Sequence, residues 1–344
     1  MDTAEAERAE DRRPRRPTGR RAGPWTSGAL LTGLSVVVGC RAADTDGITP
    51  VPQLLAFLPW LLAPLGLALL LALFARWRTG MVWGVVVLGA IAWFTEPYGR
   101  TREPVGSPVA ELRVLTSNVQ FGRGTPALIA TVRRERPAVV FVEECEHVCS
   151  RALRNAFQRT GGPYPYRESV EGAGSDGSVI MSRYPLTKAD GIRATMGMPG
   201  AVADVDGHPV RLQLAHPMPP LPGQVGLWRH ELGELRAYAA ARGATPTLIA
   251  GDFNASQDHA AFRRLLDTGL RDASRLAGAP RTPSWPARTT PALGAQIDHV
   301  LVSREFSATG AAFLPVAGSD HRALLVDLTL HSPDESGDGS AKRS

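Results

Sequence analysis

Five short segments of this 344-residue sequence carry carboxylate, amide and imidazole side chains that could bind a divalent cation and transfer protons. Carboxylate and amide oxygens bind hard divalent cations, whereas imidazoles donate and accept protons near neutral pH. One such segment alone is a weak signal, but the five together in this order are specific. They are TSNV (116–119), VEEC (142–145), GDFNAS (251–256), IDHVLVS (297–303) and GSDHR (318–322).

The elements that must position these side chains are strands. Each segment adjoins a short apolar run, and loops at strand ends are where a rigid sheet places functional groups. Helical patterns separate several of the runs. The predicted strands are 112–115, 138–142, 178–181, 210–214, 247–250, 297–302 and 323–328, and the predicted helices are 125–136, 226–241 and 258–266.

In this set and order the segments resemble the endonuclease/exonuclease/phosphatase superfamily, which includes DNase I-like nucleases, sphingomyelinases and inositol-phosphate phosphatases. The resemblance covers roughly residues 111–330, and SDGSVIMSRYPL (175–186) is similar to a mid-domain strand of the family. It implies an α/β fold, a four-layer sandwich of two packed mixed sheets with helices on the outer faces.

The resemblance also implies a metal site. Asn118 and Glu144 would help to hold the ion, and Asp320 would lie near it. A divalent ion neutralises phosphate charge and lowers the pKa of bound water. Oxygen ligands of this kind favour Mg²⁺ or Mn²⁺, so we expect Mg²⁺ as the cofactor.

The remaining family positions imply catalytic roles. Asp252 would position or deprotonate the attacking water, and Asn254 would hold a phosphate oxygen. His321 would contact the phosphoryl group, with Asp298 fixing its tautomer and supporting its cationic form. His216, in LAHP, matches a position where lipid- and phosphate-hydrolysing members carry a substrate-contacting histidine.

Other candidates are interpreted as structural. Glu143 and His299 neighbour Glu144 and Asp298 on strands, so their side chains should face away from the site. His147, His230 and His259 are expected on solvated surfaces. The sequence does not decide whether Cys145 and Cys149 form a disulfide, because their spacing on a regular helix gives a marginal Cα separation.

Three long uncharged runs precede these segments, and we expect them to be transmembrane helices of about 23–40, 52–75 and 80–95. About 20 apolar residues cross a bilayer, so the second run is long enough and the other two are near the short limit. A signal peptide is the alternative for the first run.

The positive charges suggest an orientation. The arginine-rich tail is more basic than any later loop, which predicts a cytoplasmic N-terminus and, after three crossings, an extracellular catalytic domain of a multi-pass cell-membrane protein. The predicted organisation is a disordered tail (1–22), a transmembrane region (23–95), a linker (96–110), the catalytic domain (111–330) and a second disordered tail (331–344).

The substrate is the least determined feature. This architecture resembles the VanJ-type membrane proteins associated with teicoplanin resistance, which implies hydrolysis of undecaprenyl pyrophosphate and recycling of a cell-wall lipid carrier. A lipid-linked phosphate and the membrane are therefore the expected partners, and no obligate protein partner can be inferred. Apolar loops at 218–221 and 285–286 could approach lipid.

The alternatives are an extracellular nuclease, a phospholipid phosphodiesterase and a non-enzymatic membrane scaffold. Acidic and basic residues nearly balance after residue 100, although the whole chain has a net charge of +5. A protein that grips a nucleic acid backbone usually carries a basic face, so a nucleic acid substrate is disfavoured. The full set of metal-site carboxylates argues against the scaffold.

Overall fold

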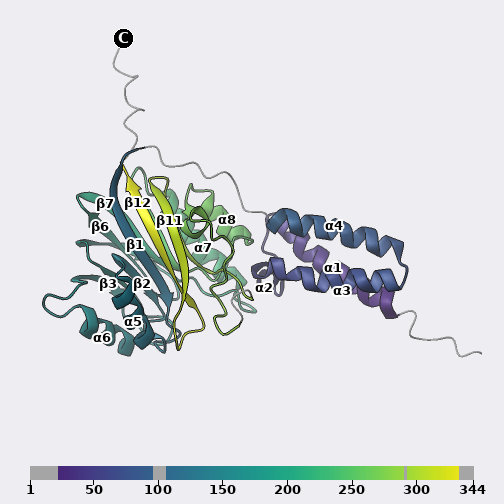
Figure 1. Ribbon diagram of the computed structural model, residues 1–344, viewed down its shortest axis with the longest axis horizontal. Coiled ribbons are helices and arrows are strands. Elements are labelled where there is room, and N and C mark those ends of the chain that lie inside the picture. The colour runs from purple at the N-terminus through teal and green to yellow at the C-terminus, as the bar shows by residue number, and fades with distance from the viewer. Residues whose placement is uncertain (1–21, 96–105, 290–292, 333–344) are drawn as a thin grey trace, which may run out of the picture. The chain divides into compact units, whose positions relative to one another are not determined.

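The computed structural model describes residues 22–95, 106–289 and 293–332 (Figure 1). The chain forms two compact units: Met1–Gly39 with Leu58–Glu96, and Cys40–Phe57 with Pro97–Ser344. The predicted disordered tails lie almost wholly outside the described residues, as does most of the predicted linker.

The first unit is helical. It contains most of α1 (Ala22–Ala42), the short 3-10 helix η2 (Leu58–Leu61), α3 (Leu62–Phe74) and α4 (Arg78–Thr95). Ser27 Oγ donates to the carbonyl of Ala68 at 2.8 Å, and Trp83 Nε1 donates to Ser35 Oγ at 2.9 Å. Polar side chains therefore link α1 to both α3 and α4.

The expectation of three transmembrane helices is not supported. Among the described residues only α4 is long and apolar enough to cross a membrane, and a buried core helix or a signal sequence would meet the same criterion. The second run is interrupted by η2, which leaves the apolar stretch Leu58–Phe74 shorter than the roughly 20 residues that a bilayer requires. The first helix includes several Gly, Ser and Thr residues that dilute its apolar character.

The second unit is built on two mixed six-stranded sheets. The first has the order β11-β12-β1-β2-β4-β3 and the second the order β5-β6-β7-β8-β10-β9. The β1–β2 and β7–β8 pairs are parallel, and the other pairs are antiparallel. The strands are β1 (Pro108–Asn118), β2 (Val139–Glu143), β3 (Tyr166–Val170), β4 (Ser178–Ser182), β5 (Leu186–Ile192), β6 (Met198–Val205), β7 (His208–Ala215), β8 (Thr247–Asp252), β9 (Arg271–Asp272), β10 (Asp298–Val302), β11 (Phe306–Pro315) and β12 (Arg322–His331).

These sheets form a four-layer sandwich, as the resemblance implies. The central core lies between the sheets and includes Val114 and Phe141 from one and Leu212 and Leu248 from the other. A second core packs helices on the outer face of the first sheet, and a third does the same for the second sheet. The helices of this unit are α2 (Val51–Ala56), α5 (Thr125–Glu135), α6 (His147–Phe157), α7 (Val225–Ala240), α8 (Ala260–Leu266) and α9 (Ala273–Leu276).

All seven predicted strands and all three predicted helices are present, with ends shifted by a few residues. Sequence reasoning missed β3, β5, β6, β9 and β11. Strands β3, β5 and β11 carry few buried residues and so lack an apolar signal, and β9 has only two residues. Strand β6 is mostly buried, but Pro199 and Gly200 interrupt its apolar run. It also missed α6, whose first turn is capped by Glu146 through the backbone N–H groups of Val148 and Cys149.

Candidate active site

The site lies at one edge of the sandwich, where strand ends from both sheets meet. Strands β1, β2, β7 and β8 end at this edge, and β10 and β12 begin there because they run antiparallel to their neighbours. Asp298 pairs directly with Asp252 in the β10–β8 register. Side chains that are far apart in the sequence are thereby brought together at one edge of the sandwich.

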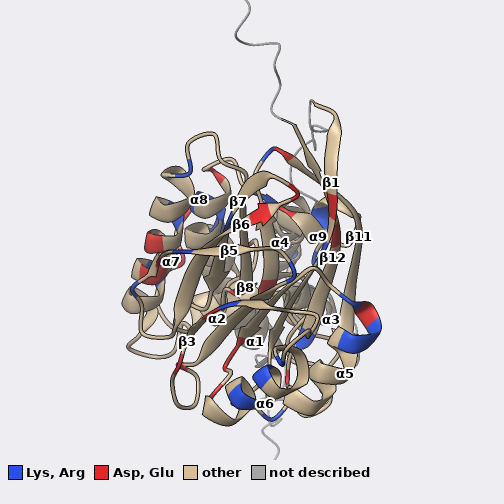
Figure 2. Ribbon diagram, turned by 90° about the vertical axis from the view of Figure 1, so that its left-hand side faces the viewer, with Lys and Arg blue, Asp and Glu red and all other residues tan. Residues whose placement is uncertain are grey.

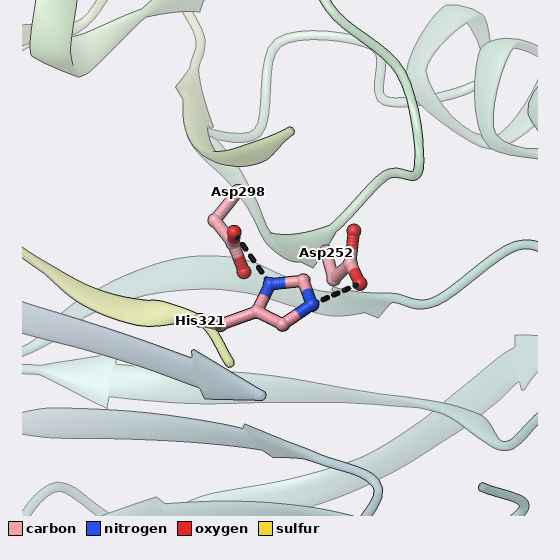
Figure 3. A group of neighbouring side chains, drawn as sticks. All are labelled: Asp252, Asp298 and His321. Atoms are coloured by element: carbon pink, nitrogen blue, oxygen red, sulfur yellow. Dashed lines mark hydrogen bonds and ion pairs between the residues drawn. The ribbon is translucent and has the colours of Figure 1, made fainter. Parts of the chain in front are cut away.

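An imidazole between two carboxylates forms the centre of the site (Figure 3). His321 Nδ1 lies 2.9 Å from Asp298 Oδ2, and His321 Nε2 lies 3.7 Å from Asp252 Oδ2. All three side chains are buried. The hydrogen bond to Asp298 fixes which nitrogen of His321 faces Asp252, as the sequence analysis predicts for this pair.

The charges of this group follow from its burial. Burial alone would lower the pKa of His321, but the carboxylates of Asp298 and Asp252 raise it to about 10. Burial raises the pKa of Asp252, against the opposing effect of the His321 cation. His321 is therefore cationic at neutral pH and can neutralise a phosphoryl oxygen, while Asp252 is a stronger base than a solvated aspartate.

Asn118 connects this group to Glu144. Its Nδ2 donates to Glu144 Oε1 at 3.1 Å and to Asp252 Oδ2 at 3.2 Å, while its Oδ1 accepts from the backbone N–H of Gln120 at 2.9 Å. The amide nitrogen, rather than the oxygen, faces the carboxylates in this arrangement. Asn118 thus orients two carboxylates here, and its role as a metal ligand stays a prediction.

Glu144 leaves strand β2 in an unusual backbone conformation. Its φ is 56°, in the left-handed region that non-glycine residues rarely adopt, and its Oε2 accepts from the backbone N–H of Phe121 at 2.9 Å. Strain of this kind persists where surrounding structure enforces it, often at functional sites. The turn aims Glu144 into the site and away from the face occupied by Glu143.

His216 and Asn254 complete the group of predicted catalytic residues. His216 follows β7, and its Nε2 lies 4.0 Å from Glu144 Oε1. Burial, followed by the nearby His321 cation, lowers the pKa of His216 to about 3, so this imidazole is neutral. Asn254 donates from its backbone N–H to Asp252 Oδ1 at 2.8 Å and from its side chain to the carbonyl of Pro217 at 3.0 Å.

A cleft of about 700 Å³ opens over these residues. Glu144, His216, Asp252, Asp320 and His321 line it. The Asp320 carboxylate accepts a hydrogen bond from Trp285 Nε1 at 3.2 Å, which holds Asp320 at the rim beside an aromatic ring. Six of the eight predicted site residues line this cleft. The other two, Asn118 and Asp298, are hydrogen-bonded to residues that line it.

The donor set fits a hard divalent cation. Ligand atoms of Asp252, Asp298 and His321 lie within 4.8 Å of one another. However, His321 Nδ1 is already bonded to Asp298, which makes these three a charge-paired triad rather than three open ligands. The carboxylates of Glu144 and Asp320, which face the cleft, are the better oxygen donors for such an ion.

Several neighbouring groups are structural. His299 is buried, with Nδ1 2.7 Å from Asp272 Oδ2 and Nε2 2.9 Å from the carbonyl of Ala255, and so faces away from the site as expected. Cys145 and Cys149 form a disulfide with a Cα separation of 5.2 Å. The two cysteines can approach because Cys145 precedes α6 instead of lying on it.

Two residues differ from expectation or were undervalued. His259 is fully buried, not solvated: its Nε2 lies 2.8 Å from the carbonyl of Pro52, a residue far away in the sequence. Glu143 is fully buried next to the site, and burial followed by the nearby Asp298 raises its pKa well above the usual range. Thr116 Oγ1 donates to its Oε1 at 2.9 Å, and no local sequence signal separates Glu143 from a core position.

The fold and the convergent site define a class of phosphate-ester hydrolases, and sequence comparison identifies the family. The endonuclease/exonuclease/phosphatase family model matches residues 115–321, well over half of the chain, so this chain belongs to that family. Membership of this family indicates a hydrolase that acts on phosphoester bonds. No curated protein sequence matches the chain at a significant level.

Solved structures share the fold at low sequence identity. Humanized D. rerio TDP2 carrying 14 mutations is 17% identical with a TM-score of 0.54, over 63% of this chain and 98% of that one. D. rerio TDP2 complexed with a single-strand DNA product is 17% identical with a TM-score of 0.53, over 64% and 99%. An endonuclease/exonuclease/phosphatase from Beutenbergia cavernae is 21% identical with a TM-score of 0.51, over 65% and 72%.

Proposed function

We propose that this chain is a divalent-metal-dependent phosphoesterase that hydrolyses a lipid-linked phosphate at the outer face of the cell membrane. The candidate substrate is undecaprenyl pyrophosphate. The observation that carries the proposal is the convergence of His321, Asp252 and His216 in one cleft with the carboxylates of Glu144 and Asp320. A bound divalent ion would supply charge neutralisation and a more acidic water.

The chain's own residues account for the proton and charge balance of hydrolysis. Asp252 accepts a proton as water oxygen bonds to the terminal phosphorus, and the phosphoanhydride P–O bond breaks. The lipid monophosphate leaves as an anion and needs no proton. Cationic His321 and the side-chain amide of Asn254 stabilise the phosphoryl oxygens, where charge develops in the transition state.

A lipid-linked substrate is supported by the apolar character of the chain outside the site. Helices α3 and α4 expose several large aliphatic side chains, including Leu67, Leu70, Val82 and Val86. Contiguous exposed apolar surface of this kind is typical of proteins that contact lipid or another protein. We propose that these helices anchor the chain in the membrane, with α4 as the segment best able to cross it.

A nuclease is the second candidate, because D. rerio TDP2 with the same fold binds a single-strand DNA product. The charge distribution of the catalytic unit disfavours it here. Figure 2 shows acidic and basic residues mixed along α5 and α7 instead of gathered on one basic face. Among the described residues, those lining the cleft include no lysine or arginine.

Phosphate release by the purified full-length protein tests the proposal. With Mg²⁺ present, we expect turnover of isoprenyl pyrophosphates, little turnover of phospholipids or DNA, and loss of turnover on chelation. Cleavage of DNA with a steep dependence on salt, and no release from isoprenyl pyrophosphates, would replace the proposal with the nuclease. Activity that persists unchanged in excess chelator would show that the reaction does not depend on a divalent metal.

A further inference from the structure

One wall of the active-site cleft comes from a segment far from the catalytic motifs in the sequence. Thr49, Pro50, Pro52, Gln53, Ala56 and Phe57 line the cleft together with the catalytic side chains. They belong to Cys40–Phe57, here called the docked segment, which groups with the catalytic unit. No motif in the sequence associates this segment with the site.

Charged groups hold the first half of the docked segment on α8. The Asp46 carboxylate is buried and accepts hydrogen bonds from the backbone N–H groups of Ala260 at 2.6 Å and Ala261 at 3.2 Å. Asp44 pairs with Arg263 and, at 3.2 Å, with Arg264. These contacts place a carboxylate at the N-terminus of α8, where the unpaired N–H groups favour it.

A second set of contacts holds the half of the docked segment that lines the cleft. His259 Nε2 lies 2.8 Å from the carbonyl of Pro52, and Gln53 Nε2 donates to the carbonyl of Pro220. Arg41 pairs with the buried Asp258 at 3.5 Å. The segment is therefore attached at several points along its length, as a fixed wall requires.

This wall and the loops opposite it are apolar. The ring centroids of Phe57 and Trp285 lie 6.1 Å apart, and Met218, Pro220 and Leu221 line the same cleft. Leu221 is 48% exposed, so its side chain is available to a ligand. The apolar residues and the catalytic groups line the same cleft, so a molecule bound through its phosphate at His321 can extend its remaining part along this wall.

We propose that the docked segment and the 218–222 loop form a binding site for the aliphatic chain of the substrate, an alkyl or isoprenyl phosphoester. The inference rests on the proposed function and identifies the residues that select for an aliphatic chain on the leaving group. Burying an aliphatic chain stabilises a complex in proportion to the apolar area removed from water. A nucleic acid would leave this surface unmatched, because the docked segment and the 218–222 loop supply mainly apolar groups, and the described lining of the cleft holds no lysine or arginine to meet a phosphate backbone.

Binding of alkylphosphonates tests the proposal without requiring turnover, because their C–P bond is not hydrolysed. Titration calorimetry of the full-length protein in amphipol, with Mg²⁺, compares methyl-, butyl- and octylphosphonate. We expect affinity to increase by up to about four-fold for each added methylene. Equal affinity along the series, or no binding by any member, overturns the inference.

One variant in the docked segment and one in the 218–222 loop identify where the chain binds. We expect Phe57→Ser and Leu221→Ser each to weaken octylphosphonate roughly ten-fold while methylphosphonate binding stays the same. Val148→Ser, at a side chain 60% exposed on α6 and outside the cleft, is the matched control and should change neither. An unchanged chain-length gradient in both cleft variants rejects the site.

The two proposals fail in different ways. A chain-length gradient in binding without phosphate release from any isoprenyl pyrophosphate rejects the proposed function and leaves the apolar site standing. Phosphate release from isoprenyl pyrophosphates at a rate independent of chain length, together with flat phosphonate affinities, keeps the phosphoesterase and rejects the apolar site.

Discussion

At the scale of single residues, the chemistry depends on how burial and charge set the state of two imidazoles. His321 is held cationic by two carboxylates, whereas His216, also buried, has no hydrogen-bond partner at Nδ1 among the described residues and is neutral. Two histidines in one cleft thus have different roles available to them. The cation can neutralise a phosphoryl oxygen, and the neutral ring can hydrogen-bond to the substrate.

The first prediction concerns the roles of His321 as the cation and Asp252 as the base. His321→Ala and Asp252→Asn should each lower kcat for phosphate release by at least about 10³-fold, because the first removes a fixed cation and the second a base. The measurement is steady-state phosphate release with thermal unfolding recorded in parallel. His230→Ala, at an exposed position on α7, is the control and should retain full activity. Near-wild-type turnover in either site variant contradicts the assignment.

The second prediction separates His216 from the charged triad. His216→Ala should lower kcat by roughly 10²-fold, since it removes a neutral group that contacts the transition state without abolishing the base or the cation. His216→Asn keeps a hydrogen-bonding side chain and should recover part of that loss. The same kcat for both variants would mean that the position contributes packing alone.

At the scale of elements, contacts between distant segments keep the site edge in place. The β8–β10 pair sets Asp252 opposite Asp298, and the docked segment packs on α8 just beyond it. His299, next to Asp298 in β10, is tied to Asp272 of β9. A substitution that breaks the contact of the docked segment with α8, or the contact between His299 and Asp272, would shift the site edge without altering a catalytic side chain.

The third prediction tests the tie between the docked segment and α8. Asp46→Ala removes the acceptor of two backbone hydrogen bonds and should lower the free energy of unfolding by about 1–2 kcal/mol. Denaturant unfolding of the full-length protein measures it. Asp190→Ala, at an exposed position of β5, should stay within about 0.5 kcal/mol of wild type. Equal stability of the two variants would show that the tie contributes nothing.

The fourth prediction concerns the pH dependence of the β9–β10 tie. Burial alone would raise the pKa of Asp272, but His299 and Ser274 lower it below the ordinary aspartate value of 3.8. Because the folded-state pKa is depressed, the stabilisation is present above pH 3.8 and is lost as the pH falls through the folded-state value. Asp272→Asn should therefore be less stable than wild type at neutral pH, and the difference in Tm between the two proteins should narrow below about pH 4. A gap in Tm that is constant with pH contradicts this.

At the scale of the whole molecule, the chain joins an apolar helical unit to a catalytic unit with balanced charge. We propose membrane attachment through the exposed aliphatic residues of α3 and α4, and α4 is the one described helix with the length and composition to cross a bilayer. The number of crossings decides the side on which the catalytic unit works. The arginine-rich N-terminal tail favours a cytoplasmic start.

The fifth prediction tests that placement. A cysteine introduced at the exposed Ser107 should react with a membrane-impermeant thiol reagent on intact cells, as expected for an extracellular catalytic unit. The matched background is Cys40→Ser, because Cys40 is the free cysteine among the described residues. Labelling that requires cell lysis would place the catalytic unit in the cytoplasm and end the cell-wall substrate hypothesis.

The sequence by itself determined the α/β class, the buried strands and the identities of the groups at their ends. These features are local: a buried strand such as β8 contains a continuous apolar run, and its last two residues are the Gly and Asp of GDFN. The order of the motifs then implied the family and the sandwich. The exposed edge strands β3, β5 and β11 escaped prediction because solvent-facing positions leave no apolar pattern.

Only the tertiary structure decided which distant groups meet. Asp46 and Ala260 are separated by 214 residues, and nothing local to either one indicates their contact. The burial of His259, the orientation of the Asn118 amide and the apolar wall at Phe57 are likewise set by partners remote in the chain. The physical reason is that burial and pairing depend on three-dimensional neighbours, whereas periodicity and turn chemistry record only neighbours in sequence.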